Sequence, residues 1–345
     1  MTLIHESKSS NSYRSVNRLH LVSCIGVDHE LNLLPHFLRH YLGLGIERHL
    51  MHFILQSNDS ESSNLERAKD FLQDYEIDPR QLWRDRYTSA SMWERRRSLQ
   101  AQYVPDGDWV LNADVDELHA YPATPRCIVE FCVRREILAV QGVMIDRLSK
   151  NSKLVSVNDE ESIDKQFPIC ADVMCSVAGK GQFHDQRGTV KLMLHSGSVF
   201  PGIGGHCTHS EIDDSKFLIG QPLANHPDIC DPGFRFVFPF QVHHFKWTST
   251  LGLRLKRRLA TPGITNAGLE YDSKILNLVN GSGVIEIPEG AIMQRKEHRN
   301  EDWRRTVTRY RHQRRWIKQI CALKLKSRSL LKKIFPYRLS AWLGI

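Results

Sequence analysis

Short apolar runs alternate with helical stripes over the first third of the chain. Three runs predict buried strands, and two stripes whose apolar residues recur every three or four positions predict helices. In chain order the segments are 19–27 (strand), 33–42 (helix), 49–56 (strand), 63–75 (helix) and 108–113 (strand). Strands that alternate with helices in this way form parallel sheets with right-handed crossovers. The pattern therefore predicts an α/β fold.

A polar loop follows each of the three predicted strands. The loops are 28–30, 57–60 and 114–116, and each contains side chains that are common in ligand sites. In a parallel sheet these loops lie together at the carboxyl ends of the strands, where open α/β sheets bind their ligands. We therefore expect one ligand site built from the three loops.

The rest of the chain shows weaker periodicity, and 150–187 is polar with few cues. The further expected elements are strands at 137–145, 190–194 and 234–245 and a helix at 250–259. A stretch rich in Gly, Asn and Pro then predicts a boundary. The expected organisation is a disordered leader at 1–17, one large domain at 18–260, a linker or irregular segment at 261–290 and a helical extension at 291–345.

Two acids separated by one residue, Asp114 and Asp116, follow the apolar run Trp109-Val110-Leu111. In an extended strand, residues i and i+2 point to the same side, so the two carboxylates are expected to converge. Two carboxylates suit a hard divalent cation such as Mg²⁺ or Mn²⁺ and leave coordination sites for substrate oxygens. The alternative is an Asp-rich turn without a ligand.

Four stretches resemble, in order, the motifs of bacterial glycosyltransferase family 2-like proteins. They are the opening strand and helix at 22–46, Asp-Trp-Val-Leu-Asn-Ala-Asp-Val-Asp-Glu-Leu at 108–118, Val190-Lys191-Leu192-Met193 with Gly204-Gly205-His206, and His243-His244-Phe245-Lys246-Trp247. The resemblance covers residues 19–260. It implies a GT-A fold, which is Rossmann-like, with a mixed, mainly parallel sheet flanked by helices. It also implies a metal-dependent, hexosyltransferase-like enzyme that moves a sugar from a nucleoside-diphosphate sugar to a polysaccharide, glycolipid or protein acceptor.

The resemblance also assigns roles to side chains. The ligands of Mn²⁺ or Mg²⁺ would be Asp114, Asp116 and a late histidine, with His244 as the candidate and His243 as its alternative. The nucleotide sugar would contact Asp28, Glu30, Asn58, Asp59, Asp114 and Lys246. The catalytic groups would be Asp116, Glu117, His206 and Glu211. This chain departs from the family where Ser57 and Ser62 replace two acids of the second loop. The alternative is turn chemistry for the loop residues and core packing for the histidines.

Positive charge is concentrated near the C-terminus. Residues 295–338 contain sixteen Lys or Arg against three acids, a balance of +13, whereas the whole chain carries +8 and the remainder therefore −5. Apolar residues recur there at helical spacing, beginning with Trp303, Val307 and Tyr310. We expect residues 303–320 to pack on the large domain and 324–345 to reach an anionic membrane surface, close to a lipid-linked acceptor. The alternatives are a purely packed helix or a nucleic-acid-binding segment.

Composition sets further bounds. The 41% hydrophobic and 25% charged content is ordinary for a globular protein, and no run of 18 apolar residues predicts a membrane span. The eight cysteines form no Cys-x-x-Cys pair, which favours reduced thiols. The polar, serine-rich start lacks the apolar segment of a signal peptide. We therefore expect a cytoplasmic protein, peripheral on the inner face of the cell membrane, and no nucleic acid as its main partner.

Overall fold

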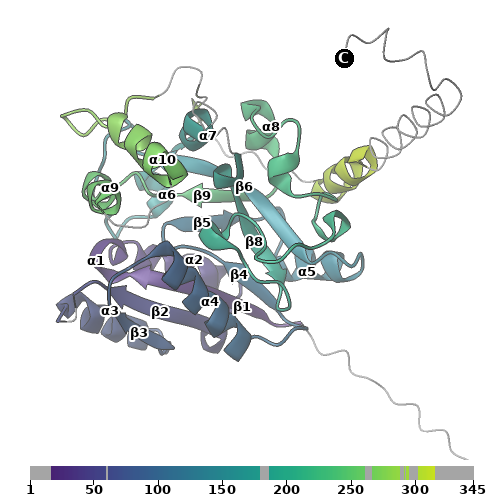
Figure 1. Ribbon diagram of the computed structural model, residues 1–345, viewed down its shortest axis with the longest axis horizontal. Coiled ribbons are helices and arrows are strands. Elements are labelled where there is room, and N and C mark those ends of the chain that lie inside the picture. Colours follow the sequence, from purple (N-terminus) through teal and green to yellow (C-terminus); the bar gives the residue numbers. More distant parts are fainter. Residues whose placement is uncertain are drawn as a thin grey trace, which may run out of the picture.

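The computed structural model describes residues 17–59, 61–178, 186–260, 266–287, 291, 293–294 and 302–314. These residues form a mixed sheet flanked by helices (Figure 1). The α/β class predicted from the sequence is therefore confirmed. The leader expected at 1–17 lies outside the described residues, except for Asn17.

The sheet has ten strands within the described part of the chain. They are β1 Leu19–Gly26, β2 Met51–Ser57, β3 Gln81–Arg84, β4 Trp109–Asn112, β5 Glu117–Ala120, β6 Ala139–Leu148, β7 Ile169–Ala171, β8 Val190–Ser196, β9 Gln241–His244 and β10 Met293–Gln294. The strand order is β10-β7-β6-β8-β4-β1-β2-β3, and β9 joins β5 to β6.

The first half of the sheet is parallel, as the strand–helix alternation predicts. Strand β1 lies between β2 and β4 and is parallel to both, and β2 is parallel to β3. In the second half only β6 and β9 are parallel, whereas the pairs β4–β8, β6–β8, β6–β7, β5–β9 and β7–β10 are antiparallel. A mixed sheet is confirmed, but the expectation of a mainly parallel one is wrong. Antiparallel strands need no helical crossover, so the apolar pattern alone does not identify their neighbours.

Described helices cover both faces of the sheet. They are α1 Val27–Glu30, α2 Leu34–Gly43, α3 Ser63–Asp74, α4 Ser89–Tyr103, α5 Pro125–Val133, α6 Ile163–Gln166, α7 Val173–Ala178, α8 Pro232–Val237, α9 Leu251–Leu259 and α10 Asn266–Asn277. Alternate residues of β1 separate the two faces: Leu21 and Ile25 pack in the core with α2 and α3, whereas Val22 and Cys24 pack with α4.

Two segments differ from the sequence expectation. The strand expected at 234–245 is divided into helix α8 and strand β9, because Asp231 caps the helix by accepting from the Gly233 N–H and Pro232 occupies its first turn. The sequence predicts a linker or irregular segment at 261–290. The structure corrects this prediction, because helix α10 lies within these residues. Helix α10 buries Ile275 in a core cluster and is tied to α9 by an ion pair between Arg258 and Asp272 at 2.8 Å.

The first part of the basic extension packs on the large domain. Residues 303–314 are helical (Figure 1). Trp303 and Val307 are buried, and Tyr310 packs against the same core. Arg311 donates to the carbonyl oxygens of Phe217 and Leu218. The apolar stripe of residues 303–314 thus packs on the large domain, as expected for this part of 303–320. Residues 315–320 and the segment expected to reach a membrane lie outside the described residues. In the part of the chain that is described, no helix has both the length and the apolar character to cross a bilayer.

A buried chain of polar side chains crosses the strands at their amino ends. Arg80 donates to His52 Nδ1 at 3.3 Å, His52 Nε2 lies 2.9 Å from His20 Nδ1, and His20 Nε2 lies 3.1 Å from Asp108. The contacts are satisfied together when both imidazoles are neutral, with each Nε2 as the donor. Burial lowers the pKa of His20, and burial and the neighbouring His20 lower that of His52 to about 3.

These lowered pKa values predict acid-sensitive stability. As pH falls below about 6.5, the unfolded chain binds protons that folded His20 and His52 do not, so the free energy of unfolding falls by up to about 1.4 kcal/mol per pH unit for each histidine. His52→Gln should flatten the slope between about pH 6.5 and 5 in chemical denaturation, although its stability at neutral pH should be lower. His209→Gln, at an exposed position, is the matched control. An unchanged slope in His52→Gln would contradict the assignment.

Candidate active site: a buried acidic cluster at the strand ends

The acids of the 114–117 segment lie in a tight turn at the carboxyl end of β4. The turn joins β4 to β5 and is closed by a hydrogen bond from the Glu117 N–H to the Asp114 carbonyl oxygen at 2.9 Å. Asp114 and Asp116 are therefore not strand neighbours that face one side, and the i, i+2 argument is wrong for them. The turn directs the two carboxylates to different cations.

Lys191 binds two of these acids at once. Its Nζ donates to Asp114 Oδ2 at 2.9 Å and to Glu117 Oε1 at 2.8 Å. Lys191 comes from β8 and is buried. Gly205 packs directly against it with a φ of 67°, and a Cβ there would lie 3.0 Å from Lys191 Cε. A side chain at position 205 would therefore be strained and would press on the lysine.

A second buried cation, Arg96 of α4, also binds Asp114. Its Nη1 donates to an Asp114 oxygen, while its Nη2 donates to the carbonyl oxygens of Val22 and Ala113. Burial opposes ionisation of Asp114, but Lys191 and Arg96 outweigh it and lower its pKa to about 2. Burial raises the pKa of Glu117 despite the contact with Lys191. Asp114 is thus an anion whose position is fixed from two sides.

Asp116 faces the other side of the turn, toward His244 and Arg254. Its Oδ2 lies 3.6 Å from His244 Nε2 and 3.1 Å from Arg254 Nη2. Burial opposes its ionisation, but His244 and Arg254 outweigh this effect and hold its pKa well below the usual range. Strands β5 and β9 pair Glu117 directly with His244, so one acceptor atom from each of Asp116, Glu117 and His244 lies within 4.8 Å of the others.

This group fits a divalent metal by its donor set. Two carboxylates and an imidazole suit Mn²⁺, and carboxylates also suit Mg²⁺. His244 Nδ1 faces away from Asp116, 3.0 Å from the sulfur of Met174 and 3.8 Å from an oxygen of Asp146. Such contacts orient the imidazole and leave its Nε2 toward the acids. The structure thus brings together Asp116, Glu117 and His244, whereas Asp114 is the carboxylate fixed by Lys191 and Arg96.

The two adjacent histidines face different partners, as strand alternation predicts. His244 lies beside Asp116, whereas Nδ1 of His243 lies 3.0 Å from Nη1 of Arg147. Both are buried. Of the two candidates for a metal ligand, only His244 lies in the acidic group.

Asp28 lies in the short helix α1 and not in the loop that the sequence predicted at 28–30, and it joins this helix to the loop after β2. Its carboxylate accepts from the Ser57 hydroxyl at 2.8 Å, from the Asn58 N–H at 3.2 Å and from the Ser62 hydroxyl at 3.4 Å. The two serines that replace family acids therefore hold Asp28 in place. Asn58 and Asp59 are exposed. Asp59 accepts from the Glu61 N–H within its own turn, whereas Asn58 accepts from the Tyr87 N–H and so ties this loop to the segment before α4.

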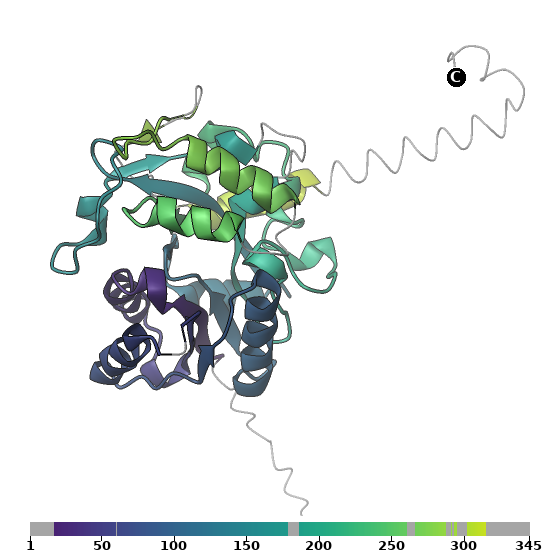
Figure 2. The same cartoon turned by 60° about the vertical axis from the view of Figure 1, so that its left-hand side comes forward.

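Helix α9 lies beside α1, as both ribbon views show (Figures 1 and 2). Arg257 Nη1 lies 3.3 Å from His29 Nε2, and Arg254 reaches Asp116 from the same helix. Glu30 accepts from the Gly26 N–H at 2.8 Å. Burial and the nearby charge of Asp116 raise the pKa of Glu30 to about 8, despite Arg254. Glu30 is therefore an acid that stays protonated near neutral pH.

The other predicted residues lie at different distances from this group. Lys246 is buried, and burial lowers its pKa to about 8, so it is not a solvated surface lysine. His206 follows Gly205, and its Nδ1 lies 2.7 Å from the carbonyl oxygen of Val190, next to Lys191 in sequence. Glu211 is exposed, and no hydrogen bond or ion pair among the described residues joins it to the acidic cluster. The catalytic roles of His206 and Glu211 stay predictions.

Three cations of the site have no role in the sequence prediction: Arg96, Lys191 and Arg254. Lys191 lies within a stretch that resembles the family, and Arg254 stands in the basic helix expected at 250–259. Arg96 belongs to α4, which the periodicity did not reveal. That helix buries Arg96 and Gln100 on its packed side, and these polar residues interrupt its apolar stripe.

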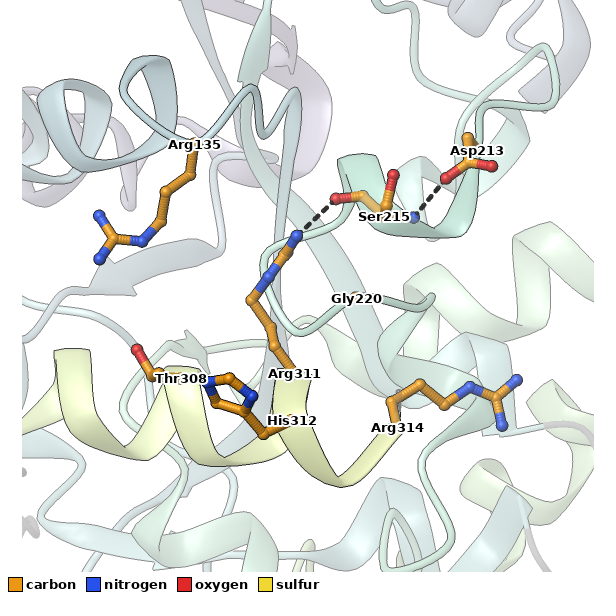
Figure 3. Close-up of a pocket in the computed structure, with 8 residues that line it drawn as sticks. All are labelled: Arg135, Asp213, Ser215, Gly220, Thr308, Arg311, His312 and Arg314. Carbon is orange, nitrogen blue, oxygen red and sulfur yellow. Dashed lines mark hydrogen bonds between the residues drawn. The ribbon is translucent and has the colours of Figure 1, made fainter. Parts of the chain in front are cut away.

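A separate cavity of about 500 Å³ lies where the C-terminal helix packs on the large domain (Figure 3). Arg135, Arg311, His312 and Arg314 line it together with Asp213. Arg311 donates to the Ser215 carbonyl oxygen, and Arg314 lies 4.0 Å from Asp214. No residue of the acidic cluster lines this cavity, so the two are separate features.

No family model matches this chain, and no curated protein matches it. The resemblance to glycosyltransferases therefore depends on the motifs alone.

The different surroundings of the two histidines predict different effects. His244→Ala should lower the affinity for Mn²⁺ by at least about tenfold, because it removes one of three converging donor groups. His243→Ala should leave Mn²⁺ affinity unchanged and lower stability, because it leaves buried Arg147 without this partner. Isothermal titration with Mn²⁺ and denaturant unfolding of both variants measure the two effects. Equal Mn²⁺ affinities in the two variants would exclude His244 as a ligand.

Proposed function

We propose that the protein is a metal-dependent glycosyltransferase of the GT-A type. It would transfer a sugar from a nucleoside-diphosphate sugar to a saccharide, glycolipid or protein acceptor. The observation that carries the proposal is the convergence of Asp116, Glu117 and His244 within 4.8 Å, next to the carboxyl ends of parallel strands. Ligands of open α/β sheets bind at these ends.

The arrangement of the loops supports a nucleotide-sugar donor. Asp28 connects helix α1, which follows β1, to the loop after β2, and the acidic turn follows β4, so all three segments border one edge of adjacent parallel strands. Asp114 keeps 32% of its side chain exposed while Lys191 and Arg96 fix it. A fixed, partly exposed carboxylate is suited to accept hydrogen bonds from donor hydroxyl groups.

The residues of the site would have different roles in the reaction. Asp116, Glu117 and His244 would hold Mn²⁺ or Mg²⁺, which when bound supplies positive charge to the leaving diphosphate. Lys191 would keep Glu117 and Asp114 in position, because it bridges them at 2.8 and 2.9 Å. His244 would keep its orientation through Met174 and Asp146. Preorganised groups of this kind add little reorganisation to the reaction.

The nucleic-acid alternative receives no support from the described part of the basic extension. Trp303, Val307 and Tyr310 pack in the core, so these side chains are not available to stack on bases. An anionic membrane or a lipid-linked acceptor remains a proposal that concerns residues outside the described part.

The proposal predicts different effects for the two aspartates. Asp116→Asn should abolish Mn²⁺-dependent turnover of the donor and weaken Mn²⁺ binding, because Asp116 belongs to the metal group. Asp114→Asn should raise KM for the donor with a smaller effect on Mn²⁺ binding, because Asp114 is fixed by cations beside that group. A panel of nucleotide sugars, assayed for hydrolysis with Mn²⁺ and for thermal shift, identifies the donor with which to measure this.

Asp78→Asn, at an exposed position away from the turn, is the matched control and should behave as the wild type. Melting of each variant, followed by circular dichroism, checks the fold. If the wild type turns over no nucleotide sugar with Mn²⁺, or if Asp116→Asn retains full turnover, the proposed function is wrong.

A further inference from the structure

Arg254 lies beside the atoms that would hold the metal. Its Nη2 donates to Asp116 Oδ2 at 3.1 Å, and that same oxygen lies 3.6 Å from His244 Nε2. A divalent ion bound to Asp116 and His244 would therefore share a carboxylate oxygen with a guanidinium. Two cations so close repel each other, and strongly in a buried site. The metal and Arg254 are thus competitors for Asp116.

The guanidinium of Arg254 has unused hydrogen-bonding capacity. Its Nη1 is buried and has no hydrogen-bond partner among the described residues. A buried donor without a partner costs free energy, which a suitable acceptor would recover. About 20% of the Arg254 side chain is exposed, so the group is within reach of a bound molecule.

The surroundings of Arg254 favour an anion. Helix α9 also carries Arg257, which lies against His29 of helix α1. A planar guanidinium whose Nη1 is unbonded and whose Nη2 can leave Asp116 suits the oxygens of a phosphate group, which it can bind in a bidentate manner.

We infer that Arg254 exchanges partners when the donor binds: it neutralises Asp116 in the free protein and moves to the diphosphate of the nucleotide sugar when a divalent ion takes Asp116. Arg254 is then a phosphate-binding residue of the donor site. This inference rests on the proposed function, and it adds a residue and a coupling between two ligands. When the divalent ion binds alone, repulsion from Arg254 lowers its affinity. When the ion binds together with a diphosphate, Arg254 binds the phosphate oxygens and this repulsion is reduced. Such coupling between two ligands is reciprocal.

The test uses the full chain and two probes, Mn²⁺ alone and Mn²⁺ with excess inorganic pyrophosphate. Free Mn²⁺ is measured by electron paramagnetic resonance, and the binding of the Mn²⁺–pyrophosphate complex by isothermal titration. Arg254→Gln should bind Mn²⁺ alone about tenfold more tightly than the wild type and bind Mn²⁺–pyrophosphate about tenfold more weakly. Lys256→Gln makes the same change of charge at an exposed position of the same helix and should alter neither affinity.

Arg254→Lys provides a second variant that keeps the charge. It should bind Mn²⁺ alone as the wild type does and Mn²⁺–pyrophosphate more weakly, because an ammonium lacks the planar pair of donors. This variant decides the question if Arg254→Gln does not fold.

The predicted changes in affinity for Mn²⁺ alone and for Mn²⁺–pyrophosphate have opposite signs, so the experiment distinguishes the possible outcomes. If Arg254→Gln binds both probes more tightly, Arg254 is only a counter-ion of Asp116 and the exchange is overturned. If its affinity for Mn²⁺ alone is unchanged, there is no competition and the inference is also overturned, although the metal site stands. If neither the wild type nor Arg254→Gln binds Mn²⁺ or its pyrophosphate complex, the proposed metal site itself fails.

Discussion

The contact on which the site depends is the buried ammonium of Lys191 between Asp114 and Glu117. Burying a carboxylate without a partner costs free energy, and the three carboxylates of this turn would repel one another. Lys191 belongs to β8, the strand next to β4. Its ammonium offsets this repulsion because it lies 2.9 Å from Asp114 and 2.8 Å from Glu117. Gly205 leaves room for its side chain. Removing Lys191 alone would leave buried Glu117 and partly exposed Asp114 without that charge.

Cations divide the acidic turn into two parts with different properties. Lys191 and Arg96 fix Asp114 as an anion, whereas Asp116 is shared between His244 and Arg254. The first part is rigid because its cations are buried and also bind the backbone or a second acid. The second part contains one histidine and one arginine whose guanidinium is only partly bonded, so it can change partners. A site in which Asp114 is fixed and Asp116 can exchange its arginine partner is suited to bind a metal together with the anionic ligand of that metal.

The sequence predicted the parallel half of the fold, because β1, β2 and β4 are mostly apolar runs separated by helical segments. It did not predict how the acids are arranged. Asp114 and Asp116 were assigned to a strand end, but the turn closed by Glu117 separates them. Helix α4 was missed because Arg96 and Gln100 are buried on its packed side, where periodicity requires apolar residues. Partners such as Arg254, 138 residues from Asp116, depend on long-range packing that no local pattern contains.

The central claim is that Asp116, Glu117 and His244 hold a divalent ion that binds together with the donor diphosphate. The most direct test is a crystal structure of the protein with Mn²⁺ and a nucleoside diphosphate, with the ion located by its anomalous scattering. The account predicts one Mn²⁺ ion bound by Asp116 and His244, in contact with the diphosphate, while the Arg254 guanidinium contacts the phosphate oxygens. A diphosphate bound at the strand ends without an ion, or an ion bound away from Asp116 and His244, would contradict it.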